Sequence, residues 1–338
     1  MDDVDPIENR LQEFVPLDDH LRGLIVREQS GFYWVEIPDE EGKVYQTRLR
    51  GKLMEEAQSS DLAAIGDRVT IQPSTNEDQD NIATIVHVDE RDNVLARAVR
   101  TTGVRGSGGR ERQQVIMANA DQALFVFAVT FPNPDLPLLD RLLIVGETSA
   151  IPELYIIVNK TDLLPQEKVE SRFRDYIDMG YQLLYVSAKE ERGLDELRAV
   201  LKDKISVFTG PSGVGKSSLL NQMQQGLGRA VKSVSETSAE GVHTTRDSAL
   251  IKLDQGGYIA DTPGIRNVTI WDIEPEELDG YFRDIAQHVP DCRFNDCTHR
   301  REPGCAVRQA VKQGQVSKRR YKHYLVMREE LEAAIAIY

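Results

Sequence analysis

The sequence of 338 residues predicts a multidomain protein of the β and α/β classes, and three observations carry this prediction. Short apolar segments alternate with turn residues over residues 21–95, whereas longer apolar runs alternate with helical stretches over residues 113–270. Three cysteines and a histidine cluster within the last region, residues 271–338. These patterns favour an N-terminal OB-type β-barrel, a central domain built on an α/β sheet and a mainly helical C-terminal domain that binds a metal.

The composition narrows the class of protein. No apolar run approaches the roughly 20 residues that a membrane helix needs, so we expect a cytoplasmic protein with no membrane partner. Lys and Arg number 41 against 55 Asp and Glu, a formal net charge of −14, which as an average argues against a nucleic-acid partner. The odd number of cysteines fits a metal site in a reducing compartment better than a disulfide framework.

The N-terminal region divides into a tail and a barrel. Residues 1–20 are strongly acidic with few large apolar side chains, so we expect a disordered tail there. Residues 21–95 contain about five short strand patterns, separated by turns such as Ser30-Gly31, which favours a small barrel of the OB type. An SH3-like or other β-module with only a structural role is the alternative.

An Arg- and Gly-rich linker is expected over residues 96–112. Between Arg91 and Arg112, six arginines stand against two acids, which gives a local formal charge of +4. This composition is typical either of a solvated, flexible linker or of a segment whose arginines contact nucleic-acid phosphates. The residues alone leave both interpretations open.

The central region is expected to form a mostly parallel sheet covered by helices. Candidate strands span residues 123–129, 154–158, 183–186, 205–209, 249–253 and 258–260, and candidate helices span 136–148, 167–179, 194–201 and 216–224. In such a sheet the loops at the carboxyl ends of the strands carry the chemistry, and four motifs directly follow candidate strands.

A phosphate-binding loop follows the strand 205–209. Residues 210–217 fit the pattern G-x-x-x-x-G-K-[ST], in which backbone amides at a helix N-terminus surround the β-phosphate of a nucleotide. We expect Lys216 to neutralise the β- and γ-phosphate oxygens, a catalytic role, and Ser217 to ligate Mg²⁺. The residues expected to contact the nucleotide are Gly210, Ser212, Gly213, Val214, Gly215, Lys216, Ser217 and Ser218.

Two segments are expected to respond to the γ-phosphate. The motif Asp261-Thr-Pro-Gly264 ends the strand 258–260, where the Asp261 carboxylate can hold Mg²⁺ through water and the Gly264 amide can face the γ-phosphate. Residues 233–247 are polar and without apolar periodicity, which is typical of a mobile switch segment. Within it, Thr245 is the first candidate to close on Mg²⁺ and the γ-phosphate, and Thr244 is the second.

Two further motifs are expected to select the base. An Asn-Lys-Thr-Asp motif at 159–162 follows the strand 154–158, and its carboxylate can accept the N1 and N2 hydrogens of guanine, which adenine lacks. The first residue of this motif can engage the purine edge. A Ser-Ala-Lys motif at 187–189 can offer its alanine amide to guanine O6. The residues assigned to base recognition are Asn159, Lys160, Asp162, Ser187, Ala188 and Lys189.

The order of these motifs is unusual and points to one family. The base motifs at 159 and 187 precede the phosphate-binding loop at 210, whereas in ordinary GTPases of the TRAFAC class they come last. With this circular permutation the chain, from about residue 21, resembles the RsgA (YjeQ) family of ribosome-small-subunit-dependent GTPases. The other stretches that carry the resemblance are Gly66-Asp-Arg-Val69, Ala118-Asn-Ala-Asp-Gln122, Asp140-Arg141, Gly241-Val-His-Thr-Thr245 and Cys292-Arg-Phe-Asn-Asp-Cys297-Thr-His299.

The resemblance implies a fold and a function. The implied fold is an OB-type barrel, a central circularly permuted P-loop GTPase domain and a C-terminal zinc-binding domain. The implied function is hydrolysis of GTP to GDP and phosphate, stimulated by the small (30S) ribosomal subunit, in late maturation of that subunit, with binding of its rRNA. Because the chain soon leaves the GTPase domain after Asp261, we expect a nucleotide-dependent shift near residues 261–269 to reach the C-terminal domain directly.

The C-terminal region combines metal ligands with basic residues. Cys292-x4-Cys297-x-His299-x5-Cys305 supplies three thiolates and one imidazole, a set that fits a closed, tetrahedral and therefore structural Zn²⁺ site. Between residues 291 and 328, ten Lys or Arg stand against three acids, a formal charge of +7. We therefore expect this face to contact RNA rather than only solvent, in spite of the net charge of the chain.

The residue that orients the attacking water has two interpretations. Ile265 occupies the position after D-x-x-G where many GTPases carry Gln, and an apolar side chain cannot hold water. His243 in the switch segment can replace it, or His243 is an ordinary exposed residue. Gly213 stands where some related GTPases carry an Asn that positions K⁺, so potassium dependence is not assigned.

Three functions are compatible with these residues. The first prediction is a monomeric, cytoplasmic, Mg²⁺-dependent GTPase with one structural Zn²⁺, whose partners are GTP, GDP, the small subunit and its rRNA. The first alternative is a non-ribosomal regulatory GTP switch whose barrel and zinc modules bind protein partners. The second alternative is a P-loop enzyme that transfers phosphate to another acceptor.

Overall fold

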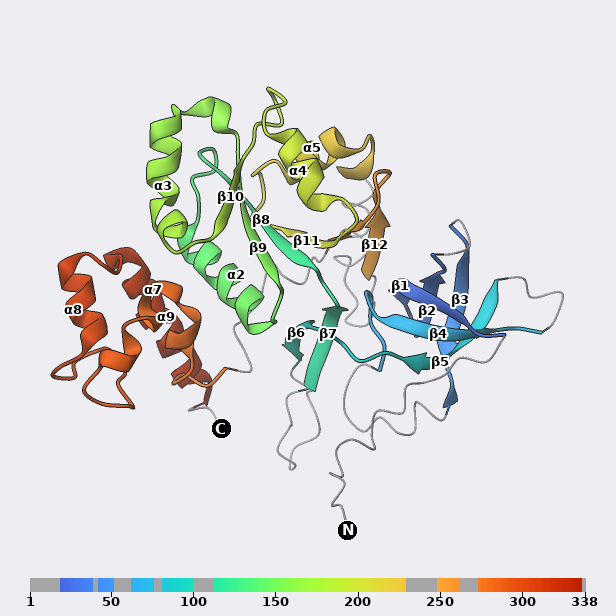
Figure 1. The fold of residues 1–338 in the computed structure, drawn as a ribbon, viewed down its shortest axis with the longest axis horizontal. Coiled ribbons are helices and arrows are strands. Elements are labelled where there is room, and N and C mark those ends of the chain that lie inside the picture. Colours follow the sequence, from blue (N-terminus) through green and yellow to red (C-terminus); the bar gives the residue numbers. More distant parts are fainter. Residues whose placement is uncertain are drawn as a thin grey trace, which may run out of the picture.

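A computed structural model describes residues 19–38, 42–51, 62–75, 81–99, 112–228, 248–261 and 273–335. Figure 1 shows a β-barrel in the N-terminal part, a sheet with helices in the middle and a helical C-terminal part. Residues 1–18 of the acidic tail, most of the Arg- and Gly-rich linker and the expected switch segment lie outside the described residues.

The barrel contains five strands among the described residues. They are β1 (Leu21–Gln29), β2 (Phe32–Glu36), β3 (Val44–Leu49), β4 (Arg68–Pro73) and β5 (Ile82–Val88). Their order is β1-β2-β3-β5-β4, and β4 pairs back onto β1, so the barrel is closed. Only the β3–β5 pairing is parallel. Side chains at alternate positions, such as Ile25, Val35 and Ile85, fill its interior, which confirms the predicted OB-type barrel.

A two-stranded ribbon occupies part of the expected linker. The strands β6 (Val94–Val99) and β7 (Arg112–Ala118) pair antiparallel, so residues 96–99 and 112 belong to strands and only 100–111 lie outside the described residues. Leu95, Val115 and Met117 are buried. Their alternation was hidden in the sequence because arginines and glycines dominate the composition around them.

The central sheet has the order β10-β9-β8-β11-β13-β12. Its strands are β8 (Gln122–Ala128), β9 (Glu153–Asn159), β10 (Gln182–Tyr185), β11 (Ile205–Thr209), β12 (Ser248–Lys252) and β13 (Tyr258–Asp261). All pairings are parallel except that of β12 with β13. The parallel arrangement brings the carboxyl ends of five strands to one edge of the sheet.

Helices cover both faces of this sheet. They are α2 (Leu136–Thr148), α3 (Gln166–Asp178), α4 (Leu194–Leu201) and α5 (Lys216–Met223). The buried side chains of α2 and α3 pack with Phe125 and Phe127 of β8, whereas those of α4 and α5 pack with Leu124 and Val126 of the same strand. β8 is therefore buried on both faces, as its continuous apolar run predicts.

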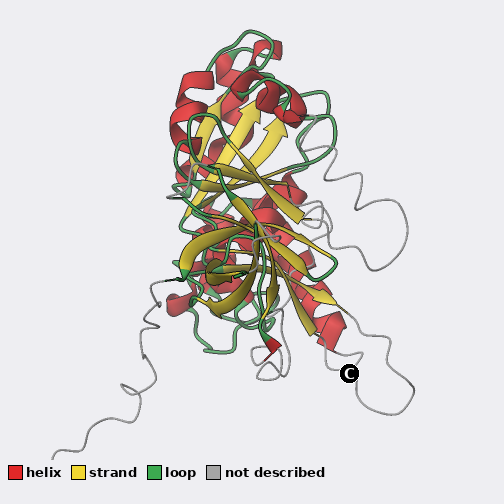
Figure 2. Ribbon diagram, turned by 90° about the vertical axis from the view of Figure 1, so that its right-hand side faces the viewer, coloured by secondary structure: helices red, strands yellow, loops and turns green. Residues whose placement is uncertain are grey.

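The barrel and the central sheet are hydrogen-bonded to each other. Arg27 and Glu28 of β1 pair antiparallel with Ala249 and Ser248 of β12, so the two sheets form one eleven-stranded sheet. Figure 2 shows the central sheet above the curved strands of the barrel. In the sequence, β12, which pairs with the barrel, thus lies between the two segments that carry the expected switch residues, 229–247 and 262–272.

The C-terminal part consists of short turns and two longer helices. Its elements are η4 (Leu278–Tyr281), α7 (Arg283–Ala286), η5 (Val289–Asp291), α8 (Ala306–Gln313) and α9 (Lys318–Ile335). Arg320 of α9 is buried, and its guanidinium donates to the carboxylates of Asp140 on α2 and Asp284 on α7. This ion-pair cluster attaches the C-terminal part to the central domain. Among the residues that the structure describes, none of the helices has both the length and the apolar character to span a bilayer.

Candidate functional site

The phosphate-binding loop lies between β11 and α5. Its glycines Gly210, Gly213 and Gly215 have φ values of +152°, +78° and +97°, a region that favours glycine. A Cβ on Gly210 would lie 2.1 Å from the carbonyl oxygen of Val126, so the loop also packs too closely on β8 for a side chain. Lys216 Nζ donates to the carbonyl oxygens of Gly210 at 2.6 Å and Pro211 at 2.7 Å. The ammonium group thus lies across the loop, where phosphate would bind.

The other residues of the loop are arranged as its pattern predicts. Val214 is buried in the apolar core that α4 and α5 cover. Ser212, Ser217 and Ser218 are exposed, and Lys216 is the first residue of α5. The phosphate-binding loop thus ends at the N-terminus of α5, and the backbone amides at a helix N-terminus provide a site for an anion.

Asn159 connects three loops at this edge of the sheet. It is the last residue of β9, and its side chain is buried. Its Nδ2 donates to the carbonyl oxygen of Val214 at 2.8 Å, and its Oδ1 accepts from the Ala188 amide at 3.4 Å. The sequence predicts contact with the purine edge, whereas in the structure this side chain joins the phosphate-binding loop to the Ser187–Lys189 motif.

The remaining base-motif residues lie beside Asn159. Ser187, which is buried, donates from its hydroxyl to Asp162 Oδ1 at 2.7 Å and so holds that carboxylate. Lys160 has a positive φ of 62°, and its Nζ donates to the carbonyl oxygen of Gly213 at 2.7 Å and to that of Phe131. Lys189 is exposed. The base motifs and the phosphate-binding loop therefore form one hydrogen-bonded group.

Phe131 was missed by the sequence reasoning. It follows β8, its carbonyl oxygen accepts a hydrogen bond from Lys160 Nζ of the base motif, and the residue is 78% exposed. A lone exposed Phe after a buried strand is not a motif, so no sequence signal marked it.

The structure describes only some of the expected switch and catalytic residues. His243, Thr244, Thr245, Gly264 and Ile265 lie outside the described residues. Asp261 ends β13 and its backbone pairs with Ala249 of β12, but its side chain lies outside the described part. The backbone of Asp261 is thus at the same edge of the sheet as the phosphate-binding loop.

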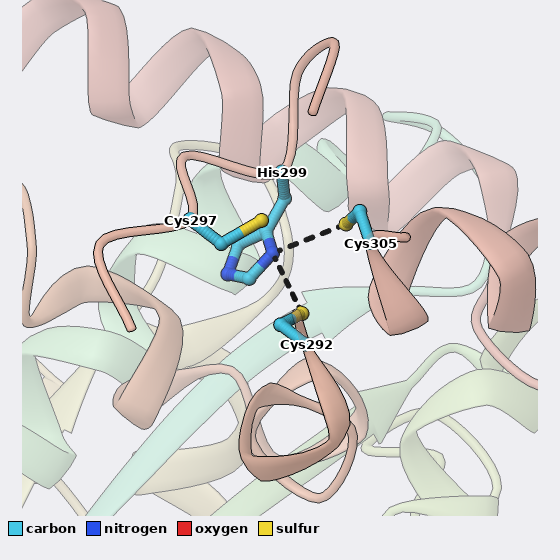
Figure 3. A group of neighbouring side chains, drawn as sticks. All are labelled: Cys292, Cys297, His299 and Cys305. Carbon is cyan, nitrogen blue, oxygen red and sulfur yellow. Dashed lines mark hydrogen bonds between the residues drawn. The ribbon is translucent and has the colours of Figure 1, made fainter. Parts of the chain in front are cut away.

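The four expected metal ligands converge. One ligand atom from each of Cys292, Cys297, His299 and Cys305 lies within 4.8 Å of every other, and all but Cys292 are buried. Figure 3 shows the sulfurs around the His299 ring, whose Nδ1 lies 3.6 Å from the Cys292 sulfur and 3.4 Å from the Cys305 sulfur. Three sulfurs and one imidazole nitrogen match the donor set of a tetrahedral metal site.

A carboxylate that the sequence did not reveal orients this histidine. His299 Nε2 donates to Asp279 Oδ2 at 2.9 Å, which leaves Nδ1 directed at the sulfurs. Asp279 lies on η4, outside the cysteine motif, so spacing alone could not identify it. Burial raises the pKa of the Cys297 thiol to about 12, and it also raises the pKa of the Cys305 thiol. A cation bound between these sulfurs would favour their thiolate forms.

Four of the ten basic residues between 291 and 328 are buried or paired with acids. Arg320 and Arg328 are buried, and Arg319 and Arg300 pair with Asp175 and Glu332. The sequence charge of +7 therefore overstates the basic surface, because these arginines neutralise acids of the same fold. The exposed basic residues are Arg293, Arg301, Lys312, Lys318 and Lys322.

Comparison with known proteins identifies the family. Residues 88–271 match the RsgA GTPase family, and residues 22–81 match the RsgA N-terminal domain. A small ribosomal subunit biogenesis GTPase RsgA from Chlorobaculum parvum is 38% identical over 319 residues, 94% of this chain and 100% of the relative. The chain belongs to the RsgA GTPase family. A second RsgA, from Moorella thermoacetica, is 39% identical over 93% of this chain and 98% of its own length.

Two solved structures of RsgA-type GTPases share the fold. YjeQ from Thermotoga maritima is 34% identical, covers 92% of this chain and 98% of its own, and has a TM-score of 0.72. YloQ, described as a circularly permuted GTPase, is 31% identical over 93% of this chain and 96% of its own, with a TM-score of 0.68. The predicted fold class is thus confirmed, and the RsgA-family chain is a GTPase.

Proposed function

We propose that this protein hydrolyses GTP to GDP and phosphate in the biogenesis of the small ribosomal subunit, and that the subunit stimulates hydrolysis. The observation that carries the proposal is the hydrogen-bonded group in which Asn159 joins the phosphate-binding loop to the base motifs. Because this group holds guanine-reading and phosphate-binding residues at one edge of the sheet, it favours a guanine nucleotide as substrate. The names of the relatives supply the ribosomal setting.

The nucleotide site has separate groups for the phosphates, the base and the metal ion. The amides of 212–218 hold the β-phosphate, Lys216 neutralises the β- and γ-phosphate oxygens, and the Asp162 carboxylate accepts the N1 and N2 hydrogens of guanine. Ser187 supports this choice, because its hydroxyl holds the Asp162 carboxylate in place. Mg²⁺, when bound, neutralises charge on the phosphates, and Ser217 and Thr245 are its proposed ligands, with Asp261 acting through water.

Gly264 and His243 are proposed to act on the γ-phosphate and the attacking water. Ile265 cannot orient water, which motivates the assignment of His243. We expect His243→Ala to lower the subunit-stimulated turnover by about 100-fold or more, the low end for loss of a positioned catalytic side chain, without weakening GTP binding. Stimulated turnover that is unchanged in this variant would show that His243 does not orient the water.

The metal is proposed to be Zn²⁺ with a structural role. The Cys₃His donor set leaves no open coordination position, so the ion has no place for substrate. The exposed basic side chains around this site and on the barrel are proposed to contact rRNA, with a monomeric enzyme acting in the cytoplasm.

Co-sedimentation with purified small subunits tests the proposed partner. We expect the protein to pellet with the subunits in a non-hydrolysable GTP analogue and to be released in GDP. If the protein pellets equally in the GTP analogue and in GDP, or does not pellet at low salt, a non-ribosomal switch is favoured. An enzyme that transfers phosphate to another acceptor would instead consume ATP and GTP alike.

A further inference from the structure

The outer face of the barrel carries two pairs of arginine and aromatic side chains. The guanidinium carbon of Arg27 lies 4.6 Å from the ring centre of Trp34, and that of Arg48 lies 4.1 Å from the ring centre of Phe32. Arg27 on β1 is directly opposite Trp34 on β2. We call these four residues the arginine–aromatic platform.

The strand pattern shows that the platform faces outward. Tyr33, Val35 and Thr47 alternate with the platform residues along β2 and β3, and all three are buried in the barrel. Arg27 and Arg48 are exposed, and both rings are half-buried. The platform is therefore accessible to a partner.

The exposed charged side chains on the strands that carry the platform are all basic. Among the described residues of β1, β2 and β3, the acidic side chains are Glu28 and Glu36, and both are buried. Glu36 also forms an ion pair with Lys252. In a chain with a net charge of −14, this basic and aromatic face is a local exception that is complementary to a polyanion.

We propose that unpaired RNA bases stack on this platform while Arg27 and Arg48 contact the neighbouring phosphates. An unpaired base can stack on an aromatic ring or on a guanidinium plane, and the base faces of single-stranded RNA are accessible. In base-paired RNA the neighbouring base pairs cover these faces. A site for duplex RNA would therefore use basic side chains and would not need aromatic rings. The proposal deepens the proposed function, because it defines the kind of RNA that the barrel recognises.

Tryptophan fluorescence reports the proposed contact directly. The chain has two tryptophans, so Trp271→Phe leaves Trp34 as the single reporter in the full-length protein. We expect an unstructured oligouridylate to quench Trp34 emission with the same Kd that fluorescence anisotropy of the labelled RNA gives, and an RNA duplex of equal length to bind more weakly without quenching. The proposal is overturned if the oligouridylate does not bind, if it binds without changing Trp34 emission, or if the duplex binds as tightly.

Matched variants separate stacking from folding. Trp34→Ala is expected to weaken oligouridylate binding about tenfold, a typical effect of losing one stacked base, whereas Trp34→Phe retains most of the affinity. Both variants should keep the wild-type melting temperature and the basal GTPase rate. Equal affinities of the two variants would contradict stacking.

The same proteins distinguish this inference from the proposed function. If small subunits stimulate the wild type but oligouridylate does not quench Trp34, only the platform is wrong. If quenching is observed but the subunits do not stimulate hydrolysis, the ribosomal role is wrong and the platform stands.

Discussion

Asp162 is the residue on which base selectivity depends in this account. Its carboxylate accepts from Ser187 Oγ at 2.7 Å and is proposed to accept the N1 and N2 hydrogens of guanine. Asp162→Asn replaces an acceptor by a donor, so we expect GTP affinity to fall by about 10²-fold or more and xanthine nucleotides to become the better ligands. Competition binding with GTP, ATP and XTP measures this change. Asp195→Asn, at an exposed site on α4, is the matched control, and equal effects of the two variants would refute the assignment.

Asp279 is expected to act on the metal through His299. The hydrogen bond to Nε2 fixes the orientation of the ring and of its metal-binding Nδ1. Asp279→Asn should therefore weaken zinc binding by about 10- to 100-fold, the usual effect of losing such a carboxylate. Competition with a chromophoric chelator measures the affinity for zinc, and Asp296→Asn, at an exposed acid in the loop that carries the cysteines, is the control. Unchanged zinc affinity in Asp279→Asn would mean that the backbone alone orients the histidine.

At the scale of elements, Arg320 is expected to stabilise the contact between α9, α2 and α7. Its side chain is 2% exposed and pairs with both Asp140 and Asp284. Arg320→Ala would leave two buried carboxylates without their cation, which costs about 3–5 kcal/mol in the free energy of unfolding. Denaturant titration of the zinc-loaded protein measures the loss. Lys318→Ala, one exposed position on the same helix, should change stability by less than about 0.5 kcal/mol, and a similar effect of both variants would contradict this role.

The elements of the central domain could be predicted well because their periodicity is strong. α2, α4 and β11 begin and end at the predicted residues, and the other strands differ by one residue at one or both ends. The ribbon of β6 and β7 escaped prediction because its composition is typical of a linker. The pairing of β1 with β12 escaped it because no local pattern records contacts between distant strands. Likewise, the spacing of the cysteines predicted the metal ligands, but Asp279 could be found only from the fold.

For the whole molecule, net charge and local charge lead to different expectations. The value of −14 sums 41 Lys and Arg against 55 Asp and Glu over the whole chain, and four of the arginines counted near the metal site are paired with acids of the same fold. Binding to RNA should therefore depend on few phosphate contacts at defined places, the barrel face among them, and should weaken as salt screens them.

The central claim is that the small ribosomal subunit stimulates GTP hydrolysis by this chain, and turnover with and without purified subunits tests it most directly. In low-salt buffer with Mg²⁺ and GTP, we predict that kcat rises at least about tenfold with small subunits, because binding to the subunit is proposed to position His243 on the water that Ile265 cannot hold. Large subunits should have no such effect. A kcat that stays at the basal value across a saturating range of small subunits would contradict the account.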